Sequence, residues 1–67
     1  MINEKLKTKR VSFGLTQKKL SESLGMTEVS YNRKEQGKRD FTLSELKKLS
    51  HALSLNANDI EEIFFKD

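Results

Sequence analysis

The sequence predicts an all-α protein, a compact five-helix bundle formed by a single domain of 67 residues. Apolar residues recur at helical spacing, and no stretch shows the period-two alternation of apolar and polar residues that marks a strand. Residue types that cap helices stand at the ends of these apolar stretches. Only 34% of the residues are hydrophobic, so nearly all of them are needed to fill one small core.

Residues 16–37, TQKKLSESLGMTEVSYNRKEQG, predict two short helices joined by a tight glycine turn. Thr16 is the expected N-cap of the first helix, in which Leu20 and Leu24 share one face. Thr27 is the expected N-cap of the second helix. Two helices with so short a connection cross each other, which is the helix-turn-helix geometry, with the second helix as the recognition helix.

A preceding helix is predicted over residues 1–13, with Ile2, Leu6 and Phe13 facing inward. Arg10 falls on the same inward face, four residues after Leu6, where an arginine is unexpected.

Two further helices are predicted after the recognition helix. Thr42 and Glu45 match the capping box and predict the start of a fourth helix. Its inward face is expected to carry Leu43, Leu46, Leu49 and Leu53. Asn56 is the expected cap of a fifth helix. The narrow apolar face of that helix comprises Ile60, Ile63 and Phe64.

Charge is distributed unequally along the chain. Residues 1–40 carry ten Lys and Arg against five Asp and Glu, whereas residues 41–67 carry three against five. This asymmetry favours a protein with a basic side that faces a polyanion and an acidic side that faces away from it. The alternative is that the lysines only make a small protein soluble.

Several classes of function lack the residues that they need. The chain has no cysteine, and a lone His51 without clustered carboxylates does not make a metal site. No serine has a histidine at a usable spacing, and the adjacent Glu61 and Glu62 are expected in solvent. We therefore expect no enzyme, no metal and no cofactor. The absence of a long apolar run and of a secretory signal predicts a cytoplasmic protein.

The pattern R-x-x-x-G-L-T-Q-x-x-L-x-x-x-L-G-x-T…E-x-G-K resembles the Cro/C1-type (XRE-like) helix-turn-helix family of phage repressors and small bacterial regulators. The resemblance runs from about Leu6 to Phe64, and its most specific parts are residues 14–17, 24–25 and 35–38. It implies the lambda-repressor-like fold, with the second and third helices as the helix-turn-helix. It also implies sequence-specific binding to double-stranded DNA, which would associate the protein with the nucleoid.

The resemblance places one face of the recognition helix in the major groove. By helical spacing this face carries Glu28, Val29, Asn32 and Arg33. Arg33 suits guanine, Val29 suits a thymine methyl group, and Asn32 suits adenine or a phosphate. Glu28 can accept a hydrogen bond from cytosine, or it can instead interact with the positive end of its own helix.

Contacts to the DNA backbone are expected from the two helix starts and from the loop after the recognition helix. The residues concerned are Thr16, Gln17, Thr27, Lys38 and Arg39. Gln17 corresponds to a residue that hydrogen-bonds a phosphate in relatives, and a helix N-terminus is a favourable anion site. The alternative for Gln17 is a polar side chain in water.

The resemblance also implies that Arg10 and Glu35 form a buried ion pair, because the corresponding residues do so in phage repressors. Each residue lies on an otherwise apolar face, and an unpaired buried charge is costly. The alternative for Arg10 is a phosphate contact, and one side chain could serve both roles. Lys34 departs from the apolar residue usual in the family, so we expect its stem to cover the core while its ammonium reaches the edge.

Relatives bind as dimers to half-sites about 34 Å apart, which implies a homodimer here. The expected dimerisation region is residues 54–67, with Ile63, Phe64 and Phe65 at the interface, because one narrow stripe cannot bury them all. The alternative is that both phenylalanine rings close the core.

The predicted function is repression, by a dimer that occludes a promoter at a (pseudo)palindromic operator. The alternative is a protein-binding module, such as an antitoxin or antirepressor, that acts through its acidic C-terminal helix. With no second domain in the sequence, we expect no small-molecule site.

Overall fold

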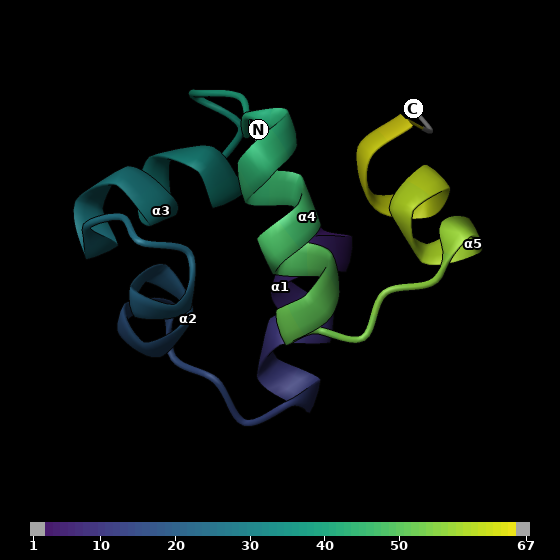
Figure 1. The fold of residues 1–67 in the computed structure, drawn as a ribbon, viewed down its shortest axis with the longest axis horizontal. Coiled ribbons are helices and arrows are strands. Elements are labelled where there is room, and N and C mark those ends of the chain that lie inside the picture. Colours follow the sequence, from purple (N-terminus) through teal and green to yellow (C-terminus); the bar gives the residue numbers. More distant parts are fainter. Residues whose placement is uncertain (1–2, 66–67) are drawn as a thin grey trace.

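A computed structural model describes residues 3–65, and within this range every regular element is a helix. The elements are α1 (Glu4–Ser12), α2 (Gln17–Ser23), α3 (Glu28–Glu35), α4 (Leu43–Ala52) and α5 (Ala57–Ile60), and α5 continues as a π-helix over Glu61–Phe65. In Figure 1, α1 and α4 lie in the middle, with α2 and α3 on one side and α5 on the other. The prediction of an all-α, five-helix fold is confirmed.

Side-chain caps determine where the helices begin. The hydroxyls of Thr16, Thr27 and Thr42 each accept a hydrogen bond from the backbone N–H three residues further on. Glu45 bonds back to the N–H of Thr42, which completes the capping box, and Asn56 forms the same box at the start of α5. These predicted caps are therefore confirmed, and each satisfies backbone groups that a helix leaves without partners.

Two glycines end the helices of the helix-turn-helix. Gly25 has φ +70° after α2, and Gly37 has φ +78° after α3. Both angles lie in the left-handed region that glycine adopts without strain. The turn after α2 is therefore short enough to make α2 and α3 cross.

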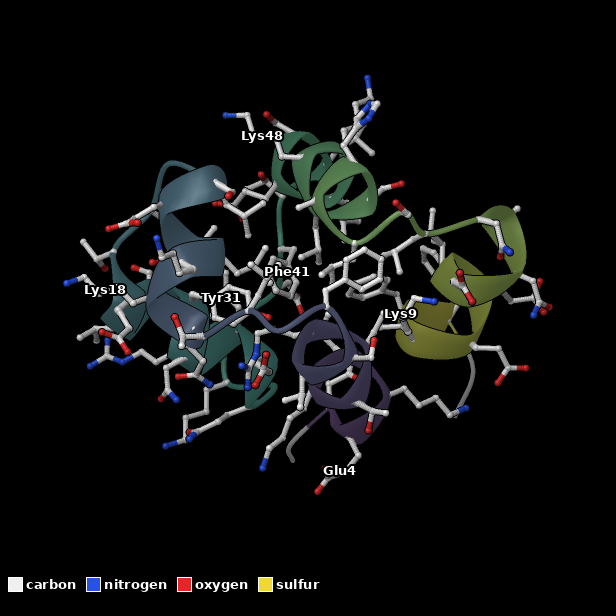
Figure 2. The ribbon with its side chains drawn as sticks, turned by 90° about the horizontal axis from the view of Figure 1, so that it is seen from below. Glu4, Lys9, Lys18, Tyr31, Phe41 and Lys48 are labelled. Carbon is white, nitrogen blue, oxygen red and sulfur yellow. The ribbon has the colours of Figure 1, made fainter. Side chains whose placement is uncertain are left out.

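The core lies where the first four helices meet. Its buried residues are Leu6, Leu20, Leu24, Tyr31, Leu49 and Leu53. The ring of Phe41 extends this core, with its centroid 6.0 Å from that of Tyr31 and 5.8 Å from that of Phe64. Figure 2 shows Tyr31 and Phe41 in the interior and Lys18 and Lys48 at the periphery. Three aromatic rings thus connect the recognition helix to the C-terminal segment.

The first helix differs from its prediction at both ends. It begins at Glu4 because Asn3 caps it, and Ile2 lies outside the described residues. It ends at Ser12, so Phe13 is not inward as predicted but has 45% of its surface exposed. Phe13 lies one residue beyond the end of α1, so the helical spacing no longer turns its side chain inward. The half-buried Leu15, beyond the turn, packs against the core instead.

Leu43 does not face the core as predicted, since 71% of its surface is exposed. Each step of three residues falls about 60° short of a full helical turn. Two such steps rotate Leu43 well away from Leu49, whereas Leu46 remains half-buried. The stripe of leucines therefore leaves the core at its N-terminal end.

The C-terminal segment is held by α1 and by the edge of the core. Ile63 and Phe64 are half-buried and pack against the core cluster. The side chain of Asn3 donates from Nδ2 to the carbonyl of Ile63 at 2.9 Å. Two ion pairs join the same elements, Lys5–Glu62 at 2.9 Å and Lys9–Asp59 at 3.6 Å.

Candidate nucleic-acid interface

Arg10 and Glu35 meet inside the protein and fix α1 to the recognition helix α3. Arg10 Nε lies 2.9 Å from Glu35 Oε2, and Nη2 lies 3.1 Å from Oε1. The third nitrogen, Nη1, donates to the carbonyl of Leu15 at 2.7 Å. Arg10 is 8% exposed and Glu35 2%. Because each guanidinium nitrogen has an internal acceptor, this geometry disfavours the alternative role of Arg10 as a phosphate contact.

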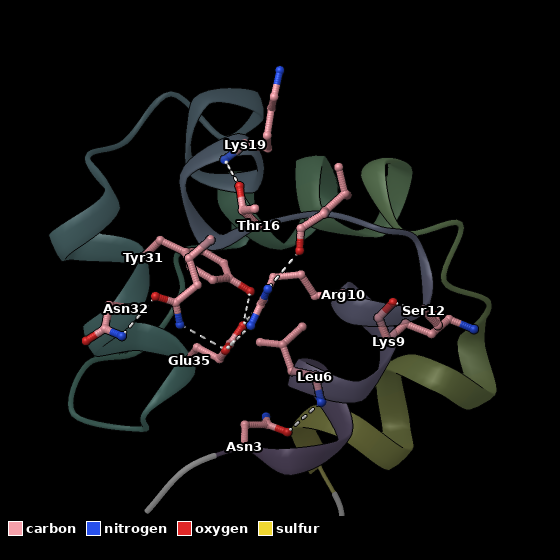
Figure 3. A network of polar contacts seen from close by, with 12 residues as sticks. Asn3, Leu6, Lys9, Arg10, Ser12, Thr16, Lys19, Tyr31, Asn32 and Glu35 are labelled. Atoms are coloured by element: carbon pink, nitrogen blue, oxygen red, sulfur yellow. Dashed lines mark hydrogen bonds and ion pairs between the residues drawn. The ribbon is translucent and has the colours of Figure 1, made fainter.

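Two further donors reach the same carboxylate. The hydroxyl of Tyr31 donates to Oε2 of Glu35 at 2.5 Å, and Gln17 Nε2 donates to Oε1 at 3.1 Å. Figure 3 shows Arg10, Tyr31 and Glu35 converging from α1 and α3. Burial of Glu35 acts to raise its pKa, but the hydrogen bonds from Arg10, Tyr31 and Gln17 outweigh burial and lower it. Burial, followed by the bond to Glu35, raises the pKa of Tyr31.

Gln17 joins this carboxylate to the outer part of the recognition helix. Its Oε1 accepts a hydrogen bond of 3.0 Å from Asn32 Nδ2, while its Nε2 is bound to Glu35. Both residues are half-buried. From the sequence, Gln17 is expected either to contact a phosphate or to lie in water. Neither expectation includes these internal hydrogen bonds. The available signal is Glu35, because a carboxylate can accept about four hydrogen bonds and a bidentate arginine supplies only two of them.

The remaining candidates for base contact lie on the solvent-facing side of α3. Glu28, Val29 and Arg33 are exposed, and Val29 has 62% of its surface accessible. Tyr31 and Glu35, from the same helix, are buried. Glu28 is the first residue of α3, near the positive end of the helix dipole, so its two predicted roles are compatible.

The other predicted contacts to the DNA backbone are accessible. Thr16 and Thr27 are exposed, and each uses a hydroxyl lone pair for its cap, which leaves the hydroxyl hydrogen for another acceptor. Lys38 and Arg39 are exposed in the loop that follows α3. These residue types are typical of phosphate contacts, which position a protein without reading sequence.

Lys34 does not reach the edge as predicted. Its Nζ donates to Glu45 Oε1, the oxygen that also accepts from the backbone N–H of Thr42. The Lys34 side chain is 11% exposed, and Nζ lies 5.9 Å from the centroid of the Phe41 ring. Because Glu45 supplies a counter-charge, the ammonium stays inside. This pair joins the end of α3 to the start of α4.

Within residues 3–65, no helix is long and apolar enough to cross a membrane. The same part of the chain contains no group of three or more metal-binding side chains.

The model of the helix-turn-helix family matches residues 6–60, from α1 to the last residue of α5. This chain belongs to the Cro/C1-type helix-turn-helix family. As a Cro/C1-type protein it is a DNA-binding helix-turn-helix regulator with the lambda-repressor-like fold. No curated protein and no solved structure matches the chain significantly. The family assignment therefore comes from the family model and agrees with the crossing of α2 and α3.

Proposed function

We propose that this Cro/C1-type regulator is a repressor that binds a (pseudo)palindromic operator as a homodimer and occludes a promoter. The proposal rests on the difference between the two faces of α3. One face is fixed into the protein through Tyr31 and Glu35, and the other presents the exposed Val29 and Arg33. A rigidly held helix with an exposed arginine is what base readout in the major groove needs.

The proposed contacts follow from residue chemistry. Arg33 reads guanine, Val29 touches a thymine methyl group, and Glu28 accepts from cytosine or interacts with its own helix end. Asn32 reads adenine. The phosphate contacts are made by Thr16, Thr27, Lys38 and Arg39, and by the free N–H of Gln17.

The dimer is proposed because a single recognition helix reads too few base pairs to specify one site in a genome. Phe65 has 71% of its surface exposed, and it belongs to the segment Glu61–Phe65 that continues α5. Figure 1 shows α5 across α1 and α4 from the helix-turn-helix. Ile63 and Phe64 pack against the core of their own chain. Among the three interface residues predicted from the sequence, Phe65 is therefore the most available to a second copy.

The test is a selection of genomic fragments by the purified protein, followed by footprinting and by transcription from the selected promoters. We expect two half-sites related by a dyad, about 34 Å apart, that overlap promoters and lower transcription when occupied. Single half-sites would contradict the dimer, whereas increased transcription would contradict repression. Failure to enrich any DNA sequence would contradict the operator itself.

A further inference from the structure

Five side chains form a hydrogen-bond network with a fixed direction: Arg10, Tyr31, Glu35, Gln17 and Asn32. An ionised carboxylate can only accept hydrogen bonds. Gln17 must therefore turn Nε2, its donor, toward Glu35 Oε1 at 3.1 Å. This turns Oε1 of Gln17 toward α3, where it also can only accept. Asn32 must then donate to it from Nδ2, at 3.0 Å.

The orientation of the Asn32 amide thus follows from a residue that it does not contact. Figure 3 shows Asn32 at the outer end of the network, with its side-chain oxygen turned away from it. With one N–H bound to Gln17, Asn32 keeps one N–H and its oxygen Oδ1 for a ligand. One donor beside one acceptor is the pair that a bidentate contact to adenine requires.

We propose that Gln17 is a positioning residue. Because Glu35 can only accept hydrogen bonds, it fixes the orientation of the Gln17 amide, and Gln17 in turn fixes which end of the Asn32 amide faces DNA. This inference rests on the proposed base contact of Asn32. Without Gln17 the amide can rotate and exchange its oxygen for its nitrogen, which presents the wrong groups to adenine. Gln17 therefore affects which base is selected as well as how tightly DNA binds.

The test compares Gln17→Met, Asn32→Ala and the double variant on a library in which each base pair of the selected site is varied. Asn32→Ala should lower the preference for adenine at one position per half-site by roughly 5- to 150-fold. Gln17→Met should lower the preference at that same position by roughly 2- to 12-fold, the equivalent of one hydrogen bond. The double variant should lose no more preference than Asn32→Ala alone.

The matched control is Gln36→Met, the same change at the second of the two glutamines, which lies at the end of α3. It should leave the base preferences unchanged. A Gln17→Met protein that loses affinity equally for all sequences would overturn the positioning role and leave only a phosphate contact. An Asn32→Ala protein with unaltered preferences would also overturn it. The proposed function would still stand in that case if the unmodified protein selects a dyad site.

A second measurement uses the unmodified protein without DNA, so it does not depend on the folding of a variant. In a sample labelled with ¹⁵N at asparagine, the side-chain amide of Asn32 should exchange its hydrogens more slowly than that of Asn58, which is exposed. Equal exchange rates would show that Gln17 does not hold Asn32, and would overturn the inference whatever the DNA results.

Discussion

The hydroxyl of Tyr31 donates to Oε2 of Glu35, the same oxygen that accepts from Arg10 Nε. Tyr31 is the largest fully buried side chain, so its hydroxyl needs an acceptor inside the core. One carboxylate thus compensates a buried cation and a buried hydroxyl together. Loss of Glu35 would leave two buried donors without their acceptor, which is costlier than the loss of a simple ion pair.

Arg10→Met should lower the free energy of unfolding by about 3–5 kcal/mol, because Glu35 would remain buried without its counter-charge. Denaturant unfolding measures the loss. Arg10→Met with Glu35→Leu should recover much of it, and adding Tyr31→Phe should recover more, since this removes the hydroxyl that lost its acceptor. Strict additivity of the single changes would show that the residues are not energetically coupled.

Stability should fall in acid. The pKa of Glu35 is lower in the folded protein than its ordinary value of 4.5, so its contribution is complete above that pH. The contribution is lost as the pH falls through the lowered pKa, because the unfolded chain then binds the proton more readily. Unfolding experiments across the acid range should show this loss, and it should be smaller in Arg10→Met with Glu35→Leu. An equal loss in both proteins would assign it to other carboxylates.

Stability should also fall in strong alkali. The pKa of Tyr31 is raised above its ordinary value of 10.0, so its contribution is present below that pH and is lost as the pH rises. Tyrosinate absorbance monitored with unfolding should show the phenol ionising only as the protein unfolds. A Tyr31 that titrates normally in the folded protein would contradict its burial against Glu35.

Lys34→Met should change the free energy of unfolding by less than about 1 kcal/mol, because a methionine can keep the contact with Phe41 while Glu45 still caps Thr42. Glu45→Ala should cost about 1–2 kcal/mol, since it removes the Glu45 half of the capping box and leaves the Lys34 ammonium without its partner. Thermal unfolding measures both. A larger loss in Lys34→Met than in Glu45→Ala would show that the ion pair, and not the bond from Thr42 N–H to Glu45, dominates here.

Arg33→Ala and Lys38→Ala should weaken DNA binding in different ways. Arg33→Ala should cost roughly 1–3 kcal/mol on the preferred base and relax selectivity at one position per half-site. Lys38→Ala should weaken binding to every sequence and reduce the dependence of affinity on salt. Binding isotherms on a site library at several salt concentrations separate the two effects. Identical profiles would contradict the roles assigned to the two residues.

Phe65→Glu should weaken binding to a complete operator while leaving binding to an isolated half-site unchanged, because it places a charge in the proposed interface. Sedimentation and binding to both DNA fragments measure this effect. Phe13→Glu is the matched control, since Phe13 is also exposed but belongs to the end of α1. Retained cooperativity in Phe65→Glu would show that the interface lies elsewhere.

The parts of the fold that local chemistry determines could be predicted from the sequence. Thr16, Thr27 and Asn56 cap the helices as expected, because each cap depends on residues three positions apart. The prediction for Phe13 fails because α1 ends before it, and helical spacing carries no information beyond the last turn. The prediction for Leu43 fails because a spacing of three residues drifts around the helix, away from the face that Leu49 occupies. The π-helix over Glu61–Phe65 has no sequence signal comparable to a cap.

The candidate site was only partly predictable for a different reason. The exposure of Arg33 and Val29 follows from the spacing within one helix. The bonds from Gln17 to Glu35 and Asn32 join residues from two helices, 18 and 15 positions apart. Such contacts depend on how α2 and α3 cross, and that angle is set by packing rather than by any local pattern.

The hydrogen bonds of Asn3 affect the order in which parts of the protein fold. Its backbone N–H donates to the carbonyl of Glu35 at 2.8 Å, and its side chain bonds both Leu6 N and the carbonyl of Ile63. The bond to Ile63 spans 60 positions, so it requires the two ends of the described chain to meet. Closing so long a loop is entropically unfavourable before the intervening helices are packed. We therefore expect the α5 segment to dock last and, in native-state hydrogen exchange, to open first, while the helix-turn-helix stays intact.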